Sequence, residues 1–249
     1  MKNKISRIIG ASLLGVFVLG ATMISSVSAE EQTIIPTRIK ADYIQYNTKT
    51  GMTQLKGNVI IYRDNGTIKA SDGEYNTQTK AGSLTGGVSG RQDDAEIISD
   101  SIIMHAGGTH ITAKGNAYIK KADKALKAEQ VEYYEDKDFM ETVGNHAELV
   151  MDDGSYLKAN YINYDMKNGT ALADGNVNIK SDVRNLVASA DKASYDTNED
   201  GIITLTGNAK ATQNGNTIES DTIKIVNTKM ANKQVARATG SVKIVYLPK

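Results

Sequence analysis

The sequence contains no cysteine, no tryptophan, only two prolines and two phenylalanines, and no excess charge of either sign. Without cysteine, a disulfide framework, a zinc site with thiolate ligands, a cysteine nucleophile and a lipoprotein anchor are all excluded. The 29 basic residues balance the 29 acidic ones, which argues against a nucleic-acid partner. With so few Phe and no Trp, large side chains cannot fill a thick core, so the fold must be thin or its interior partly open.

The first residues are typical of a targeting segment. Lys2, Lys4 and Arg7 form a basic region, an uncharged apolar stretch follows, and residues 27–29 (Val-Ser-Ala) fit a cleavage site with small residues. We therefore expect a cleaved signal peptide over residues 1–29, export of the chain, and a slightly acidic mature protein. Glycine, serine and threonine dilute the apolar stretch, which favours cleavage, but its length leaves an uncleaved membrane anchor open.

After this leader the sequence repeats itself about every 30 residues, seven times. Each copy opens with an apolar position, has a small residue two positions later, and closes with a glycine. The opening positions are Ile39, Ile68, Ile97, Leu126, Leu157, Ala188 and Ile218. The small positions are Ala41, Ala70, Ser99, Ala128, Ala159, Ala190 and Ser220. We thus expect one domain of seven hairpin repeats over residues 38–249, after a short lead of residues 30–37.

Apolar positions within a copy are two residues apart, as in Leu55, Val59 and Ile61, so the two arms of each repeat are predicted to be β-strands. Between the small position and the next apolar position the buried parity changes from odd to even. Such a change requires a bulge or a corner where the strand passes from one sheet to a second. The pattern predicts an elongated all-β fold of about fourteen bent antiparallel strands, with no helix in the mature chain.

The first repeat shows the motif most completely. Residues 39–46 read Ile-Lys-Ala-Asp-Tyr-Ile-Gln-Tyr, and residues 55–61 read Leu-Lys-Gly-Asn-Val-Ile-Ile. This pattern resembles the LptA/OstA family of periplasmic lipopolysaccharide-transport proteins, and the resemblance extends over residues 38–246. It implies a twisted, V-shaped β-jellyroll that is open along one side and holds the lipid A acyl chains of lipopolysaccharide between its sheets. It also implies a periplasmic protein that joins end to end with itself and with other OstA-like domains, as part of a bridge from inner to outer membrane.

The inward positions of the repeat are the candidate lipid-binding groove. The small residues leave space between the sheets, and an acyl chain of about a dozen methylenes held there would avoid a cost of roughly 10 kcal/mol in water. Close packing of the two sheets is the alternative explanation for the small residues. The candidate groove residues are Ile39, Ile44, Tyr46, Val59, Ile68, Tyr75, Ile102, Met104, Val131, Tyr133, Ile162, Tyr164, Val177, Tyr195 and Ile223.

A stack of strands that does not close has an unpaired edge at each end, where a further chain can add a strand. The candidate docking edges contain Ile39 and Ile44 in the first repeat, and Val242 and Ile244 in the last. Prolines 36 and 248 lie beside these edges, so the alternative that the edges are blunted stays open.

Two polar patterns are weaker candidates for metal sites. Residues 196–201 copy the first half of a calcium loop, but Gly207 stands where a bidentate Glu is needed, which favours a polar turn. A recurring acidic or amide position, Asp42 in the first copy, falls at the change of parity. There we expect local hydrogen bonds to the backbone rather than a ladder of metal sites.

The three histidines have no assigned role. His105 and His110 flank the turn at Gly107-Gly108 and could meet across a hairpin, but surface histidines near a turn are the favoured interpretation. His146 replaces an apolar residue of the repeat, which indicates an interrupted strand.

The sequence has no nucleophile elbow, phosphate loop or HExxH motif, so we expect neither an enzyme nor a cofactor. Two other classes compete with lipopolysaccharide transport. A structural or adhesive surface β-solenoid would have a filled interior, and a carrier of another lipid, such as a glycerophospholipid, would have an apolar groove. A continuous cleft would therefore count against the adhesive class.

Overall fold

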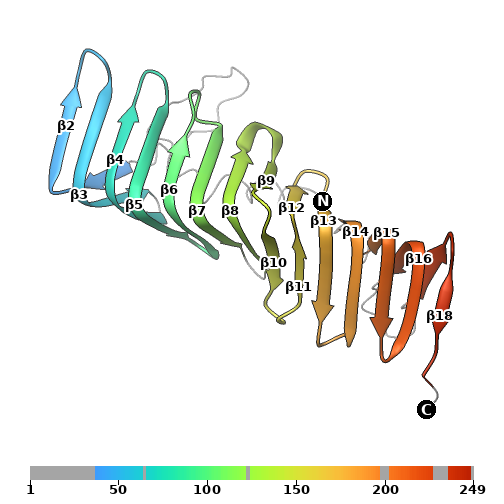
Figure 1. The fold of residues 1–249 in the computed structure, drawn as a ribbon. Coiled ribbons are helices and arrows are strands. Elements are labelled where there is room, and N and C mark those ends of the chain that lie inside the picture. Colours follow the sequence, from blue (N-terminus) through green and yellow to red (C-terminus); the bar gives the residue numbers. More distant parts are fainter. Residues whose placement is uncertain (1–36, 64–65, 122–123, 197–201, 227–234, 248–249) are drawn as a thin grey trace, which may run out of the picture. The chain divides into compact units, whose positions relative to one another are not determined.

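The computed structural model describes residues 37–63, 66–121, 124–196, 202–226 and 235–247 (Figure 1). The expected signal peptide, residues 30–36 of the lead, both prolines and residues 197–201 of the calcium-like segment lie outside these ranges. The described residues form two compact units. The N-terminal unit extends to Ala122 and includes Glu132–Asp136, and the C-terminal unit comprises Asp123–Val131 and Lys137–Lys249.

The described residues are all-β, as predicted, apart from a single turn of 3-10 helix, η2 (Glu135–Lys137). None of their helices is long and apolar enough to cross a membrane. The first strands are β1 (Thr37–Lys40), β2 (Tyr43–Asn47), β3 (Met52–Arg63), β4 (Gly66–Asn76), β5 (Ala81–Gln92), β6 (Ala95–Met104) and β7 (His110–Lys121). They are followed by β8 (Lys124–Tyr134), β9 (Phe139–Val143), β10 (Ala147–Met151), β11 (Tyr156–Ala159), β12 (Tyr161–Asp165) and β13 (Thr170–Ser181). The last strands are β14 (Leu186–Asp196), β15 (Ile202–Gln213), β16 (Asn216–Val226), β17 (Val235–Thr239) and β18 (Lys243–Val245).

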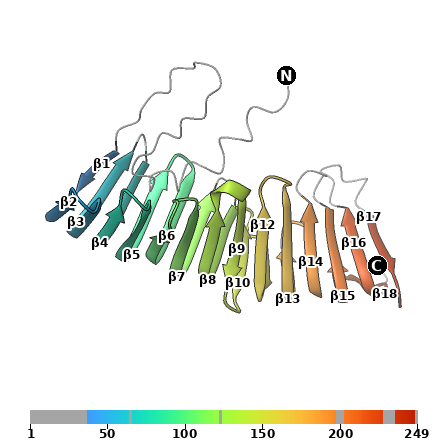
Figure 2. The ribbon, with the colours of Figure 1, turned by 90° about the horizontal axis from the view of Figure 1, so that it is seen from above.

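These eighteen strands are the fourteen arms of the seven predicted repeats. Ten arms are continuous, and four are divided at the bend into two strands: β1 and β2, β9 and β10, β11 and β12, and β17 and β18. Strands that follow each other in the chain pair in antiparallel fashion, as in β3 to β7 and in β13 to β16. Figures 1 and 2 show β13 to β16 side by side in chain order.

The change of parity occurs at a bulge. Between β3 and β4, Lys56 pairs with Asp72 and Val59 with Ala70, so Gly57 and Asn58 together face one residue. Both have positive φ angles, 71° and 48°. Glycine adopts this left-handed backbone at no steric cost and asparagine at a low one. The same Gly-Asn pair with positive φ angles recurs at residues 115–116, 175–176 and 207–208. The predicted bend is confirmed.

The recurring acidic or amide position fastens this bulge in several repeats, as expected for local hydrogen bonding. The Asp42 amide donates to the Gly57 carbonyl at 2.8 Å, and the Asn58 side chain donates to the Asp42 carboxylate at 2.8 Å. A Cβ added to Gly57 would overlap that carboxylate. Equivalent side-chain bonds join Asn176 to Asn160, at 3.2 Å, and Asn208 to Asp191, at 2.9 Å.

The N-terminal unit has a closely packed interior. Val59, Ile68 and Ile102 are at most 2% exposed. Gly73 lies between Leu55 and Leu84 on the neighbouring strands, and a Cβ there would overlap a methyl group of Leu84. A single small residue between two large ones is therefore covered by them, so that close packing leaves no gap at Gly73.

Candidate functional site

An apolar groove of about 690 Å³ lies within the C-terminal unit. This volume is in the range of sites that bind small molecules. Two rows of side chains, one on each side of the strand bend, line it. The first row runs across β12, β13 and β14 through Ile162, Ala173 and Ala193, which are direct neighbours in the pairing register. The second row includes Leu157, Ile179, Ala211, Ile218 and Ile244, on β11, β13, β15, β16 and β18.

Alanines that pair with each other across neighbouring strands account for the open space. Ala173 pairs with Ala193 across β13 and β14, and Ala188 pairs with Ala211 across β14 and β15. Two small residues side by side leave a gap that the flanking side chains do not reach across, in contrast to the single Gly73 of the N-terminal unit. The groove thus follows from which small residues become neighbours when the strands pair.

The polar residues of the groove lie toward the turns between strands. Asp153 accepts a hydrogen bond from the Ser155 amide at 2.9 Å and forms an ion pair with Arg184 at 3.5 Å. The hydrogen bonds from Ser155 and the Arg184 charge hold the pKa of Asp153 below its ordinary value. Lys180 pairs with Asp182 at 3.0 Å, and that bond raises the pKa of the lysine. An apolar interior with charged groups at its margin suits an amphipathic ligand.

The structure brings together only part of the candidate groove residues. Ile162 and Tyr195 line the groove, and so does Ile244 from the candidate docking edge. Val131, Val177 and Ile223 are buried in the same unit, and Tyr164 is half-buried. Ile218, an opening position of the repeat, lines the groove as well, and so do Ala173, Ala211 and Ile203, which the sequence did not single out. Alanines that pair across neighbouring strands are the sequence signal for this groove.

The remaining candidate groove residues belong to the N-terminal unit. Six are at most 3% exposed and form its core: Val59, Ile68, Tyr75, Ile102, Met104 and Tyr133. Ile39 is half-buried, whereas Ile44 and Tyr46 are 48% and 54% exposed. Both exposed residues lie in β2, whose pairing among the described residues is with β3. They are exposed because no described strand pairs with the other side of β2.

The two candidate docking edges expose apolar side chains. In β18, Ile244 pairs with Ile218 of β16 and is 45% exposed, and the preceding Val242 is 46% exposed. Tyr246 and Leu247 continue this exposed apolar segment at 72% and 62%. Within the described residues, β2 and β18 each pair on one side only, with β3 and β16 respectively.

The structure favours the less expected interpretation of His105 and His110, which are half-buried, and agrees with the interpretation of His146. His105 and His110 do meet across the hairpin turn, with ring centroids 4.1 Å apart. His146 is exposed and lies in the interruption between β9 and β10.

The described residues define an all-β repeat protein with an apolar groove, and comparison with known proteins makes the class more specific. Residues 38–170 and 111–232 match the family described as LptA/(LptD N-terminal domain) LPS transport protein. The matches span most of the chain, so the chain belongs to this lipopolysaccharide-transport family. This confirms the resemblance seen in the sequence.

A search among curated proteins finds no match. Among solved structures, the chain is similar to LptH, the LptA-homologous periplasmic component of the conserved lipopolysaccharide transport device from Pseudomonas aeruginosa. The two are 13% identical, the match covers 86% of this chain and 96% of that chain, and the TM-score is 0.18.

Proposed function

We propose that this protein carries lipopolysaccharide through the periplasm by sheltering its acyl chains in the groove of the C-terminal unit. The groove is the observation that carries the proposal: about 690 Å³ of space, lined by alanine, leucine and isoleucine side chains. Each methylene that moves from water into such a lining gains about 0.8 kcal/mol. The charged margin lets a polar headgroup stay in water while the acyl chains are buried.

Membership in a lipopolysaccharide-transport family selects the ligand among amphipathic lipids. The groove argues against a filled interior, as expected for a structural or adhesive solenoid, in the C-terminal unit, whereas the N-terminal unit is closely packed. We further propose that the exposed edges of β2 and β18 take up strands of other copies or of related domains, so that the chain forms part of a bridge from inner to outer membrane. Strand addition uses the free backbone groups of an edge and would extend the lining past Ile244.

Equilibrium binding tests the ligand. Purified residues 30–249 are titrated with lipopolysaccharide and, in parallel, with phosphatidylethanolamine vesicles, and bound lipid is measured by displacement of a fluorescent fatty acid. We expect displacement by lipopolysaccharide at lower concentrations than by the glycerophospholipid. Stronger displacement by phosphatidylethanolamine would favour a carrier of another lipid. A folded protein that binds neither lipid would contradict the proposal and support the structural class.

A further inference from the structure

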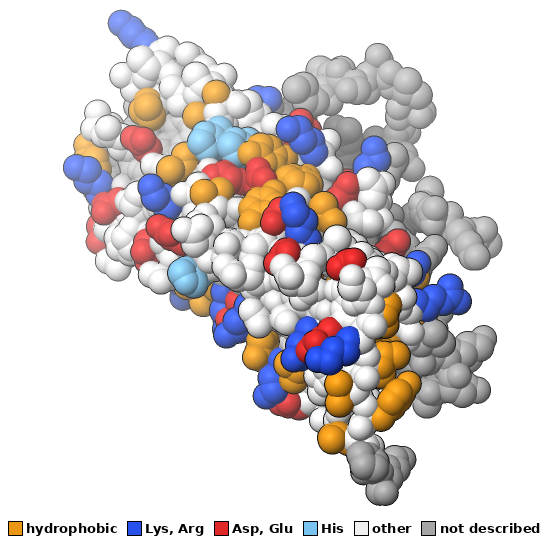
Figure 3. Space-filling view, turned by 45° about the vertical axis from the view of Figure 1, so that its right-hand side comes forward, with side chains coloured by type: hydrophobic (Ala, Val, Ile, Leu, Met, Phe, Trp, Pro, Cys, Tyr) orange, Lys and Arg blue, Asp and Glu red, His pale blue; other side chains and the backbone are white. Residues whose placement is uncertain are grey.

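A second cluster of polar side chains lies in the N-terminal unit, away from the residues of the groove. His105 directly follows β6 and His110 begins β7, and the turn between them is tied by the His105 amide, which donates to the His110 carbonyl at 2.9 Å. The two imidazole rings stack nearly parallel, with an angle of 11° between their planes. The Tyr134 ring of β8 stacks on the His110 ring, with centroids 4.4 Å apart, and fixes the orientation of His110. In Figure 3, histidine side chains reach the surface beside acidic and hydrophobic ones.

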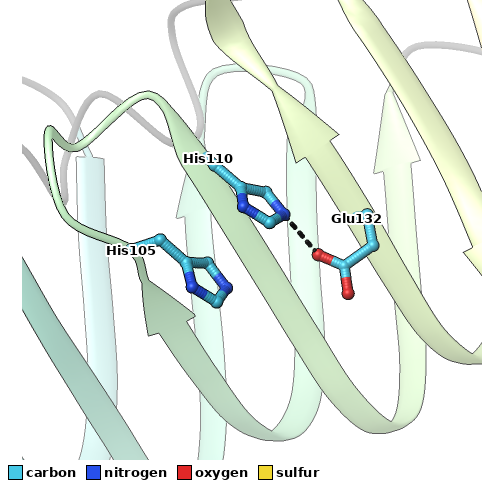
Figure 4. Close-up of side chains that lie close together, drawn as sticks. All are labelled: His105, His110 and Glu132. Carbon is cyan, nitrogen blue, oxygen red and sulfur yellow. Dashed lines mark hydrogen bonds and ion pairs between the residues drawn. The ribbon is translucent and has the colours of Figure 1, made fainter.

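Glu132 of β8 completes the cluster (Figure 4). Its Oε2 atom lies 2.7 Å from Nε2 of His110 and accepts a hydrogen bond from the Thr112 hydroxyl at 2.6 Å. The Thr112 hydroxyl is in turn 2.8 Å from Nε2 of His105. Glu132 is 9% exposed and Thr112 5%, so the carboxylate is held inside the cluster rather than in free solvent.

The three side chains present one ligand atom each, and all three atoms lie within 4.8 Å of one another. An ion bound at about 2.0–2.1 Å in tetrahedral geometry needs ligand atoms roughly 3.4 Å apart. The observed separations, from 2.7 Å to at most 4.8 Å, bracket that value. An imidazole binds an ion in the plane of its ring, so the two stacked rings would turn out of their parallel arrangement to direct both nitrogens at one ion.

We propose that His105, His110 and Glu132 form a binding site for a divalent transition-metal ion, with zinc as the best fit. Two imidazoles and one carboxylate are a zinc ligand set that leaves a fourth position for water. Calcium and magnesium prefer sites made of oxygen ligands alone, so the two nitrogen donors select against them. Thr112 serves as the outer support that orients the carboxylate, a role that outer-shell hydrogen bonds perform in metal sites.

A bound ion would fasten the β6–β7 hairpin to β8. The three ligands come from the residue after β6, the start of β7 and the C-terminal part of β8, and the ion replaces the hydrogen bond between His110 and Glu132 by shared coordination. The competing explanation is that the hydrogen-bonded chain from His105 through Thr112 to Glu132 is complete without an ion. The two explanations differ in whether the cluster takes up metal.

Metal titration separates them. Purified residues 30–249 are titrated with Zn²⁺ by calorimetry and with Co²⁺ by visible absorption, which reports tetrahedral coordination. We expect one ion per chain, and at least about tenfold weaker binding in His105→Ala, His110→Ala and Glu132→Gln. Glu132→Gln keeps the size of the side chain and an oxygen that can still accept from His110, so it tests the ligand charge in a folded protein.

The matched control is His146→Ala. It removes the third histidine of the chain, which is exposed and belongs to the C-terminal unit. We expect its zinc affinity to equal that of the unmodified chain. The proposal is overturned if no saturable binding of one ion is seen, if Glu132→Gln binds as tightly as the original, or if His146→Ala weakens binding as much as His110→Ala. Circular dichroism establishes that each variant is folded before its affinity is compared.

Discussion

Replacing a small residue of the groove lining by a large one tests most directly whether the groove holds acyl chains. Ala193 of β14 is 5% exposed, lies between Ala173 and Leu205 in the pairing register, and contributes to the groove lining. In Ala193→Phe, the benzyl group extends into space that the protein leaves open. We therefore expect a folded protein whose melting temperature changes little, in contrast to the overpacking that the same exchange would cause in a filled core.

The expected loss of affinity follows from the methylenes that no longer fit. A benzyl group replaces a methyl group, so we take it to exclude about three acyl methylenes, each worth about 0.8 kcal/mol when buried. The loss is then about 2.4 kcal/mol, which corresponds to roughly 60-fold weaker binding of lipopolysaccharide.

The control for Ala193→Phe is Val187→Phe on the same strand, where the side chain is 56% exposed and points away from the groove. The assay is displacement of a fluorescent fatty acid by lipopolysaccharide, with the melting temperature measured for both variants. We expect the control to bind as the original does. If folded Ala193→Phe binds lipopolysaccharide with unchanged affinity, the acyl chains do not lie in this groove and the reasoning is refuted.

Three further predictions concern the bulges, the margin of the groove and the edge. Gly115→Ala places a Cβ against the Asp100 carboxylate at a φ of +79°, so the free energy of unfolding in urea should fall by at least about 2 kcal/mol, clearly more than in Gly107→Ala, where the added Cβ meets no atom within 4 Å; equal losses would show that the carboxylate contact is unimportant. Because the fold lowers the pKa of Asp153, its carboxylate stabilises the protein at neutral pH, and this contribution should disappear as the pH falls below the ordinary value of 3.8. The melting temperatures of Asp153→Asn and the original should therefore differ at pH 7 and approach each other as the pH falls below 3.8, and a difference that grows toward acid would contradict the sign. Val245→Lys places a charge on the exposed edge strand, so sedimentation should show less self-association; an unchanged oligomer distribution would place the interface elsewhere.

Much of the fold could be predicted from the sequence, because each repeat carries its own local signals. The period-two pattern predicts the arms, and the Gly57-Asn58 pair marks the bulge, since only a few residue types accept its backbone angles. The breaks that divide four arms, and the 3-10 turn at Glu135–Lys137, were not evident. They depend on how a bend is accommodated in each copy rather than on the repeat itself.

The site was harder to predict because it depends on neighbours across strands. Gly73 and Ala193 occupy the same position of the repeat, yet the space beside Gly73 is covered by Leu84, whereas Ala193 has another alanine, Ala173, as its partner. Likewise Glu132 is 22 residues from His110 in the chain, and only the pairing of arms from successive repeats brings the two together. Residue types could be read from the sequence, but the register that combines them could not.

The central claim is that acyl chains travel through the groove of the C-terminal unit, and photo-crosslinking in living cells tests it most directly. A photoreactive residue replaces Ile162 or Ile218, which line the groove, and the control replaces the exposed Lys40. The account predicts crosslinks to lipopolysaccharide at both groove positions and none at Lys40. Absence of crosslinks at Ile162 and Ile218 in protein present at normal levels, or equal crosslinking at Lys40, would contradict it.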